Sequence, residues 1–301
     1  MIDTSIIVPS LDSPWIERTL AGLRREGAPG DSVEVVVVGR DSAAQIPRDG
    51  SVRFFPTEQP LNPAAARNLA IAKARGDKLI LIDADCRPLT GWLDRQRANL
   101  EHHPVAGGAV TFPRQGSRWA LADNIASFHG LLADRPADSA TEGPLGTLNL
   151  AIQRAAWERV GGFDEALTTS EDFDWVLRCR RAGLTTAFDP TAVVEHAAVR
   201  ESRQDLERHA TWYGRNFHDF ARRHPQAFGT GPTWSSRRAL ALTAPLKAYA
   251  AAYDIYRRNP SLRDARRAFG GVVHFKRVWY RTVVATWPDH QPPPAGDSDG
   301  R

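Results

Sequence analysis

Two aspartates separated by one residue follow a strand-like apolar run in the segment LILIDADCRP, Leu79 to Pro88. Asp83 and Asp85 supply hard oxygen ligands at a spacing that suits a divalent cation such as Mn²⁺ or Mg²⁺, which also takes phosphate oxygens. The same pair could instead form an Asx turn that leads into Pro88. The spacing alone therefore leaves a metal–phosphate site and a simple turn open.

A second acidic pair, Glu171 and Asp172, begins the segment EDFDWVLRCRRAG after a glycine-rich approach. The helix dipole favours acids in a first turn, which is a sufficient structural reason for both residues. The same placement would keep Asp172 ionised and solvent-accessible at the mouth of a cleft. A base that deprotonates a sugar hydroxyl needs those properties, so both interpretations stay open for this segment.

Strand and helix patterns alternate around these two pairs. Helices are predicted over 14–26, from Pro63 to a stop at Gly76 with Asn62 as N-cap, and over 170–183. The spacing and the continuous apolar strands indicate a mainly parallel sheet covered on both faces, and ligands bind beyond the carboxyl ends of such strands. Asp83 and Asp85 follow one of these ends. Strands are predicted over 5–10, 33–38, 52–55, 78–83, 105–112 and 147–152, and in TTAF and AVVEHA.

Composition restricts the class of protein. The 301 residues are 42% hydrophobic and 25% charged, as in ordinary soluble proteins. No apolar run reaches the roughly 18 residues that a membrane span needs, and MIDTSIIVPS enters a strand pattern without the basic region of a secretory signal. Two cysteines are too few for a disulfide framework or a structural zinc site. A cytoplasmic location is therefore expected.

Positive charge is concentrated near the C-terminus. Residues 230–290 hold 11 Lys and Arg against three acids, although the whole chain carries a net charge of only +4. Apolar stripes mixed with Arg, Tyr and Trp are typical of a helix on anionic lipid, and helices packed on a catalytic domain have the same composition. Peripheral association with the inner face of the cell membrane through 235–287 therefore stays open beside plain packing. No nucleic-acid-binding module is present, so nucleic acid is not an expected partner.

Several fragments, in order, resemble family 2 of the nucleotide-sugar-dependent glycosyltransferases. They are VPS, VVVVGRDS, NPAAARNLAIAKARGDKLILIDADC, GTLNLAIQRAAWERVGGFDE, SEDFDWVLRCRRAG and a downstream EH, and they cover residues 2–198. The resemblance implies an α/β fold of the GT-A type, with a Rossmann-like, mostly parallel central sheet flanked by helices. It implies a catalytic domain over 1–200, with a nucleotide-sugar half near 1–112 and an acceptor half near 113–200. A helical basic extension over 201–287 and a disordered, proline-led tail over 288–301 would follow.

The resemblance also assigns roles to residues. Asp83 would contact the donor ribose and Asp85 the metal, with Ala84 between them in the nucleotide-sugar site. Glu171 and Asp172 match the family's E-D pair, whose aspartate is the candidate base. His196 would complete the metal or diphosphate site, with a structural role as its alternative. Pro9, Ser10 and Arg67 are expected around the nucleotide, and Asn149 and Trp157 on the acceptor side, where Trp157 could equally be core.

One loop departs from the family pattern. Its second strand commonly ends in VDDGS, whereas this chain has VGRDS, so Gly39 and Arg40 occupy the acidic positions. A cation cannot accept the imide hydrogen of uracil or thymine, which places the usual UDP preference in doubt. Arg40 is expected to meet an acceptor on the base or a phosphate. Asp41 could substitute for the missing acid only through a rearranged loop.

The predicted function is transfer of a sugar from a nucleoside-diphosphate sugar to a hydroxyl acceptor by metal-dependent inverting displacement. The acceptor would be a sugar or a lipid-linked molecule, in cell-surface polysaccharide or glycolipid synthesis. A catalytically degenerate binding module is the alternative outside enzymology. A nucleotidyltransferase would need a glycine-rich phosphate loop with a lysine after the first strand, and VPSLDSPW has neither.

Overall fold

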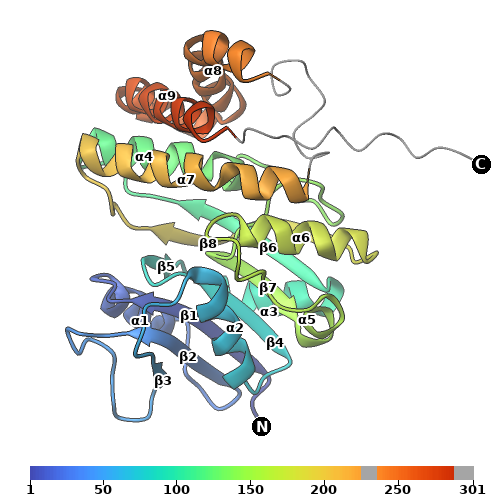
Figure 1. Ribbon diagram of the computed structural model, residues 1–301. Helices are drawn as coiled ribbons and strands as arrows, with labels where there is room; N and C mark the ends of the chain where they lie inside the picture. The colour runs from blue at the N-terminus through green and yellow to red at the C-terminus, as the bar shows by residue number, and fades with distance from the viewer. Residues whose placement is uncertain (225–235, 288–301) are drawn as a thin grey trace, which may run out of the picture.

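An eight-stranded sheet forms the centre of the computed structural model, which describes residues 1–224 and 236–287 (Figure 1). The strand order is β3-β2-β1-β4-β7-β6-β8-β5. The strands are β1 (Thr4–Leu11), β2 (Val33–Arg40), β3 (Arg53–Pro56), β4 (Lys78–Ile82), β5 (Cys86–Pro88), β6 (Val105–Thr111), β7 (Asn149–Gln153) and β8 (Thr186–His196). The helices that pack around it are α1 (Ile16–Arg25), α2 (Pro63–Lys73), α3 (Trp92–His102), α5 (Arg154–Val160) and α6 (Glu171–Arg181).

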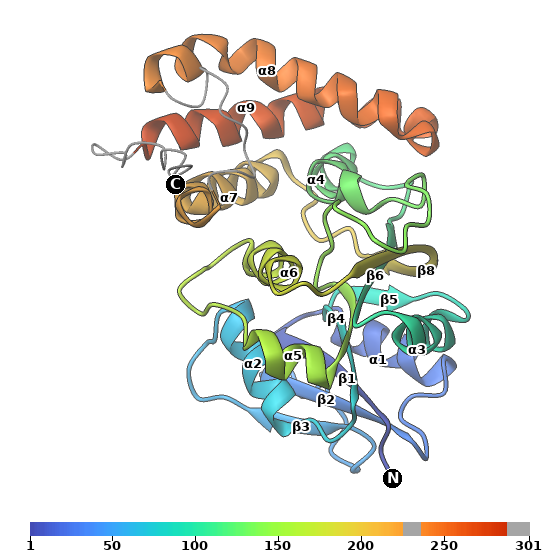
Figure 2. The same cartoon turned by 90° about the vertical axis from the view of Figure 1, so that its right-hand side faces the viewer.

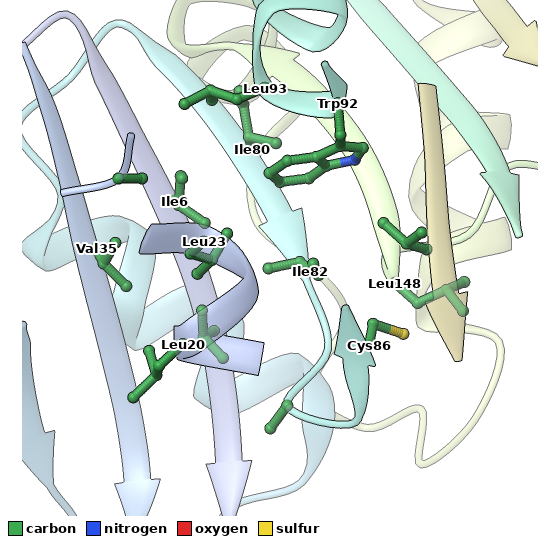
Figure 3. Packing of buried hydrophobic residues seen from close by; sticks show 14 of the residues in the cluster. Ile6, Leu20, Leu23, Val35, Ile80, Ile82, Cys86, Trp92, Leu93 and Leu148 are labelled. Atoms are coloured by element: carbon green, nitrogen blue, oxygen red, sulfur yellow. The ribbon is translucent and has the colours of Figure 1, made fainter. Parts of the chain in front are cut away.

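The first half of the sheet is parallel and buried on both faces, as its continuous apolar strands predict. β1 pairs with β2 on one side and with β4 on the other, and β3 continues the parallel order at the edge. Alternate strand residues enter two cores, one on each face. Figure 3 shows the first core, where Ile6 and Ile80 from the strands face Leu23 of α1 and Trp92 of α3. The carboxyl ends of β1, β2 and β4 consequently lie together at one edge.

The second half of the sheet is mixed. β7 lies antiparallel between β4 and β6, whereas β6 and β8 are parallel and β5 runs antiparallel to β8. β5 and α3 were not predicted from the sequence, because three residues are too few to show a strand period and α3 begins without a capping side chain. The α/β fold class is confirmed. Its parallel character belongs mainly to the first half.

A separate layer of helices covers the far end of the sheet. It consists of α4 (Arg118–Phe128), α7 (Arg203–Arg223), α8 (Arg237–Arg258), the 3₁₀ segment η3 (Pro260–Ala268) and α9 (Phe269–Ala285). In Figures 1 and 2, α9 lies between α8 and the pair α4 and α7, and all three contact it. The 113–144 region, with its mixed helical signals, thus contributes α4 to the core of this layer through Leu121 and Ile125.

Two expectations from the sequence concern a membrane span and the C-terminal tail. In the described segments, no helix combines the length and apolarity that crossing a membrane demands. The proline-led tail expected over 288–301 lies outside the described residues.

Candidate active site

Two cavities adjoin at the carboxyl ends of β1, β2 and β4. The first, of about 260 Å³, is lined by Pro9, Ser10, Gly39, Ala84 and their neighbours. The second, of about 350 Å³, extends beneath the helical layer. Their shared lining residues are Pro63, Arg67, Asp83 and Asp85. Both D-x-D carboxylates therefore lie where the two cavities meet.

Gly39 allows β1 and β2 to approach each other at the first cavity. Its φ is +134°, and a Cβ at this position would lie 1.9 Å from the carbonyl oxygen of Ser10. No other residue type fits there without displacing a backbone strand. The glycine in VGRDS is therefore explained by a close backbone approach at the cavity wall.

Arg40 and Asp41 are not among the residues that line the first cavity, so their contact with the nucleotide stays a prediction. Arg40 instead lies 3.5 Å from the carboxylate of Asp12. Asp41 accepts backbone hydrogen bonds from Gln45 at 2.8 Å and Ile46 at 3.0 Å. Because this carboxylate closes its own loop, it cannot read a base without breaking that loop.

Asp85 and His196 converge as a pair of potential metal ligands. His196 Nδ1 lies 2.8 Å from the carbonyl of Ala197, which can only accept, so Nδ1 donates. Nε2 carries a proton toward Asp85 when the imidazole is charged and offers a lone pair to a metal when the imidazole is neutral. That Nε2 lies 3.5 Å from Asp85 Oδ2. Burial opposes the charge of Asp85, but His196 and Arg200 outweigh it and lower the pKa to about 2. The pair thus presents an ionised oxygen and an imidazole nitrogen to the same space, which fits Mn²⁺ or Mg²⁺.

A cation at this pair would need additional ligands. Within 1–224 and 236–287, no three His, Cys, Asp or Glu side chains are grouped so that they could hold one ion. Hard divalent cations are commonly completed by substrate phosphates and water. A cation held by Asp85 and His196 would therefore need substrate oxygens or water as its other ligands, because these two side chains do not form an all-protein cage.

Arg67 joins the D-x-D pair to the E-D pair. Its guanidinium donates to Glu171 Oε1 at 2.5 Å and to Asp83 Oδ1 at 2.7 Å. The arginine and Glu171 are both buried. Burial opposes its charge, but the two carboxylates raise the pKa of Arg67 above its ordinary value. This single side chain fixes the position of β4's end relative to the start of α6.

Asp172 is less exposed and less acidic than its position in a first helical turn predicts. It accepts hydrogen bonds from the backbone N–H groups of Phe173 at 2.8 Å and Thr147 at 3.3 Å. Burial, followed by repulsion from Glu171, raises its pKa to about 7 against the opposing effect of Arg67. The expectation of a fully ionised carboxylate is corrected, because desolvation outweighs the helix dipole. A carboxylate that titrates near neutrality is well matched to general base catalysis.

The two predicted acceptor-side residues lie away from both cavities. Asn149 is fully bonded: its amide donates to Ala109 and Ala192 at 2.8 Å each, and its oxygen accepts from Trp92 and Gln96. No capacity remains for a ligand. Trp157 packs in the core, with its ring 5.0 Å from that of Phe163 and 5.7 Å from that of Trp175. These contacts favour structural roles for both residues, and their acceptor role stays a prediction.

The helical layer supplies the wall that sequence reasoning missed. The second cavity is lined there by Trp212 and Tyr213 of α7, Phe275, Lys276 and Trp279 of α9, and Arg200 of the preceding loop. The buried Asp123 of α4 holds this wall together, because it binds Arg200 at 3.1 Å and His209 at 2.7 Å. In the sequence, this wall is indicated by the basic, aromatic composition of the C-terminal segments. That composition does not determine which face of each helix meets the sheet.

This sheet, with two acidic pairs at its cavity edge, has the GT-A fold of nucleotide-sugar glycosyltransferases. The mannosyltransferase PcManGT from Pyrobaculum calidifontis, solved with GDP-Man and Mn²⁺, superposes with a TM-score of 0.56 at 19% identity, over 93% of this chain and 86% of that one. S. aureus TarS 1-349 in complex with UDP gives a TM-score of 0.53 at 15% identity, over 93% and 91% of the two chains.

The sequence comparison then identifies the family. Residues 5–155 match Glycosyl transferase family 2, and the chain belongs to that family. The match includes Asp83 and Asp85 and ends before Asp172 and His196.

Two curated relatives from Mycobacterium tuberculosis are similar along most of this chain. The pre-mycofactocin glycosyltransferase is 28% identical over 237 residues, 74% of this chain but 48% of that protein. The chain thus spans about half the length of that relative. The N-acetylglucosaminyl-diphospho-decaprenol L-rhamnosyltransferase is 26% identical over 293 residues, 84% of this chain and 95% of that protein.

Proposed function

We propose that this protein transfers a glycosyl group from a nucleoside-diphosphate sugar to a hydroxyl acceptor, with inversion and with a divalent metal, Mn²⁺ or Mg²⁺. The observation that carries the proposal is the junction of the two cavities. One cavity suits a nucleotide, the other leads to the candidate base Asp172, and Asp85 lies between them. A donor bound across the junction would present its anomeric carbon to the second cavity.

On the donor side, the chain's own residues bind and orient the nucleotide. Pro9, Ser10 and Ala84 line the space for the nucleoside, and Asp83, held by Arg67, is proposed to take the ribose hydroxyls. A metal on Asp85 and His196 would neutralise charge on the departing diphosphate. Arg200 lines the second cavity and lowers the pKa of Asp85, so it lies near enough to add positive charge there. Two proteins of the same fold that were solved with ligands carry GDP-Man with Mn²⁺ and UDP, which supports this class of donor.

On the acceptor side, Asp172 is proposed to remove the hydroxyl proton. The acceptor oxygen attacks the anomeric carbon on the face opposite the nucleotide, the bond to the β-phosphate oxygen breaks, and the proton remains on Asp172. The product then has the inverted anomeric configuration. Trp212 and Tyr213 offer apolar ring faces of the kind that pack against a sugar ring. A sugar or lipid-linked acceptor in polysaccharide or glycolipid synthesis is proposed, and the name of the decaprenol-linked relative supports it.

A binding module without activity is the competing function. Such a module has no need of a carboxylate whose pKa lies near neutrality beside a pair of metal ligands, and Asp172 has such a pKa. The geometry therefore favours the enzyme. An enzyme of this class working on a lipid-linked acceptor would be found at the cytoplasmic face of the cell membrane.

The test is metal-dependent nucleotide binding, measured as the melting temperature with UDP, GDP, dTDP, CDP or ADP, each with Mn²⁺ or EDTA. We expect one nucleotide to stabilise the protein with metal only, by about 2.7 kcal/mol at a concentration 100 times its Kd. Asp85→Ala should weaken that binding by about 10–100-fold, because the remaining His196 cannot hold the cation alone.

The matched control is Asp77→Ala, which removes an exposed aspartate next to the opposite end of β4. It should bind nucleotide as the wild type does. Equal stabilisation in EDTA would refute the metal dependence. No stabilisation by any of the five nucleotides would favour the binding-module alternative.

A further inference from the structure

Helix α8 carries an exposed apolar stripe. Of the eight large hydrophobic side chains that are exposed in the described residues, four lie on this helix. They are Leu242, Leu246, Tyr249 and Tyr253, with exposed fractions of 83%, 73%, 52% and 58%. Intervals of four, three and four residues place all four on one face of an α-helix. We call this set the α8 stripe.

The α8 stripe faces away from the rest of the protein. The buried side of the helix is formed by Leu240, Ala244, Ala248, Ala252 and Ile255, which at about 100° per residue lie on the opposite side. Figures 1 and 2 show α8 as the outermost helix of the layer, on top of α9. The packing side of the helix combines three alanines with Leu240 and Ile255, whereas the four large side chains of the stripe stay at least half exposed, although the ring of Tyr249 also contacts that of Phe269, with centroids 5.5 Å apart. A surface helix ordinarily turns such large apolar side chains toward the core.

Positive charge gathers at both ends of α8 and in the segment that follows it. Asp254 is the one acid of the helix, and it is paired with Arg257 at 2.9 Å and Arg258 at 2.7 Å. The adjoining η3 segment adds three exposed arginines around a single acid. The exposed basic residues at the start of α8 are Arg237 and Arg238, and those in its last turn and in η3 are Arg257, Arg258, Arg263, Arg266 and Arg267. At about 100° per residue, Arg238 and Arg257 lie on the side of the helix that carries the stripe.

We propose that the α8 stripe docks on the surface of an anionic lipid bilayer. The leucines would enter the boundary between headgroups and acyl chains, the tyrosines would lie at headgroup depth, and the arginines would meet lipid phosphates. A second copy of this chain is a poorer partner, because face-to-face stripes would bring two sets of arginines together.

Docking divides the roles of the two C-terminal helices. The apolar side chains of α9, among them Val272, Phe275 and Val283, are buried, and Phe275 also lines the second cavity. The candidate membrane segment 235–287 therefore narrows to α8. Packed helices are about 8–10 Å apart, so a docked α8 would hold the wall of the second cavity one helix layer above the lipid. The link between docking and the second cavity rests on the proposed function. Docking of α8 on a bilayer would favour an acceptor with a lipid anchor.

The experiment is co-sedimentation of the full chain with vesicles of phosphatidylcholine, alone or mixed with phosphatidylglycerol. We expect the wild type to sediment with the mixed vesicles and to be released as salt is raised, because screening weakens the arginine contacts. Leu242→Gln with Leu246→Gln should lower the partition coefficient by about tenfold or more. Leu242→Met with Leu246→Met, which keeps an apolar stripe on a helix, should bind as the wild type does.

A variant that lacks two arginines tests the electrostatic part of the proposed membrane binding. Arg238→Gln with Arg257→Gln should weaken binding about fivefold for each charge removed, whereas Arg24→Gln with Arg25→Gln on the exposed end of α1 should not. A wild type that stays in the supernatant with both vesicle types would overturn the proposal. Full binding by the variant with Leu242→Gln and Leu246→Gln would overturn it as well. If the protein formed a dimer in the absence of vesicles, and Leu242→Gln with Leu246→Gln dissociated it, the stripe would instead be the contact surface for a second copy of the chain. Nucleotide-dependent melting needs no vesicles, so failure here is distinct from failure of the proposed transferase activity.

Discussion

Asp172→Asn is expected to lower the kcat of glycosyl transfer by about 10²–10⁴-fold while the donor nucleotide still binds. Asparagine keeps an oxygen that can accept from the Phe173 N–H, so the local backbone contact survives. It cannot accept the proton of an attacking hydroxyl. The amide nitrogen would then face the Thr147 N–H and lose that hydrogen bond, but removing a charge beside Glu171 relieves a repulsion, so the melting temperature should change little. The measurement is release of nucleoside diphosphate from the donor, together with a nucleotide titration on the same sample.

The pH dependence gives this prediction a second readout. Because burial and Glu171 raise the pKa of Asp172 to about 7, the fraction of deprotonated base falls as the pH drops below that value. The wild-type kcat should therefore decline toward acid pH and level off above neutrality, and the residual rate of Asp172→Asn should lack that decline. Asp94→Asn, which changes an exposed first-turn acid on α3, should keep both the rate and the profile. An Asp172→Asn variant with wild-type kcat would exclude this residue as the base.

The position of the D-x-D pair at the cavity edge could be predicted because local patterns determine it. An apolar run that ends in Asp83 and Asp85 marks the carboxyl end of a buried strand, and parallel strands bring such ends together. Asn62 and Pro63 fix the start of α2, and the structure shows the Asn62 side chain accepting from the Ala65 N–H. In each case the chemistry and the element that positions it lie within about ten residues of sequence.

The acceptor side could not be predicted because tertiary packing determines it. Asn149 has the polarity of a ligand-binding residue, but four partners from the three elements α3, β6 and β8 consume its bonding capacity. The protonation state of Asp172 also depends on tertiary packing. The helix dipole is visible in the sequence, whereas the desolvation that exceeds it comes from side chains more than twenty residues away. The faces of α7 and α9 that line the cavity depend on how these helices meet α4.

Arg67→Met is expected to destabilise the protein by about 3–5 kcal/mol, because it leaves two carboxylates without their shared partner. Glu171 is nearly inaccessible to water, with 8% of its side chain exposed, whereas Asp83 at 31% can be partly solvated. Most of the loss should therefore come from Glu171, and Arg67→Met with Glu171→Leu should recover part of it. Urea unfolding of the two variants measures both effects.

Arg53→Met provides the matched comparison. Arg53 also pairs with a buried carboxylate, that of Glu34, at 2.7 Å, but Arg75 and Ser5 hold the same carboxylate. Loss of Arg53 should consequently destabilise the fold much less than loss of Arg67. An Arg67→Met variant with the same urea unfolding midpoint as the wild type would contradict this prediction. Water would then have to replace the guanidinium between Asp83 and Glu171, and solvent rather than this side chain would join the two halves of the site. Because the same guanidinium positions Asp83 near Asp85, the proposed metal ligand, and Glu171 beside Asp172, the proposed base, the stability loss should be accompanied by weaker nucleotide binding even at temperatures where the variant is fully folded.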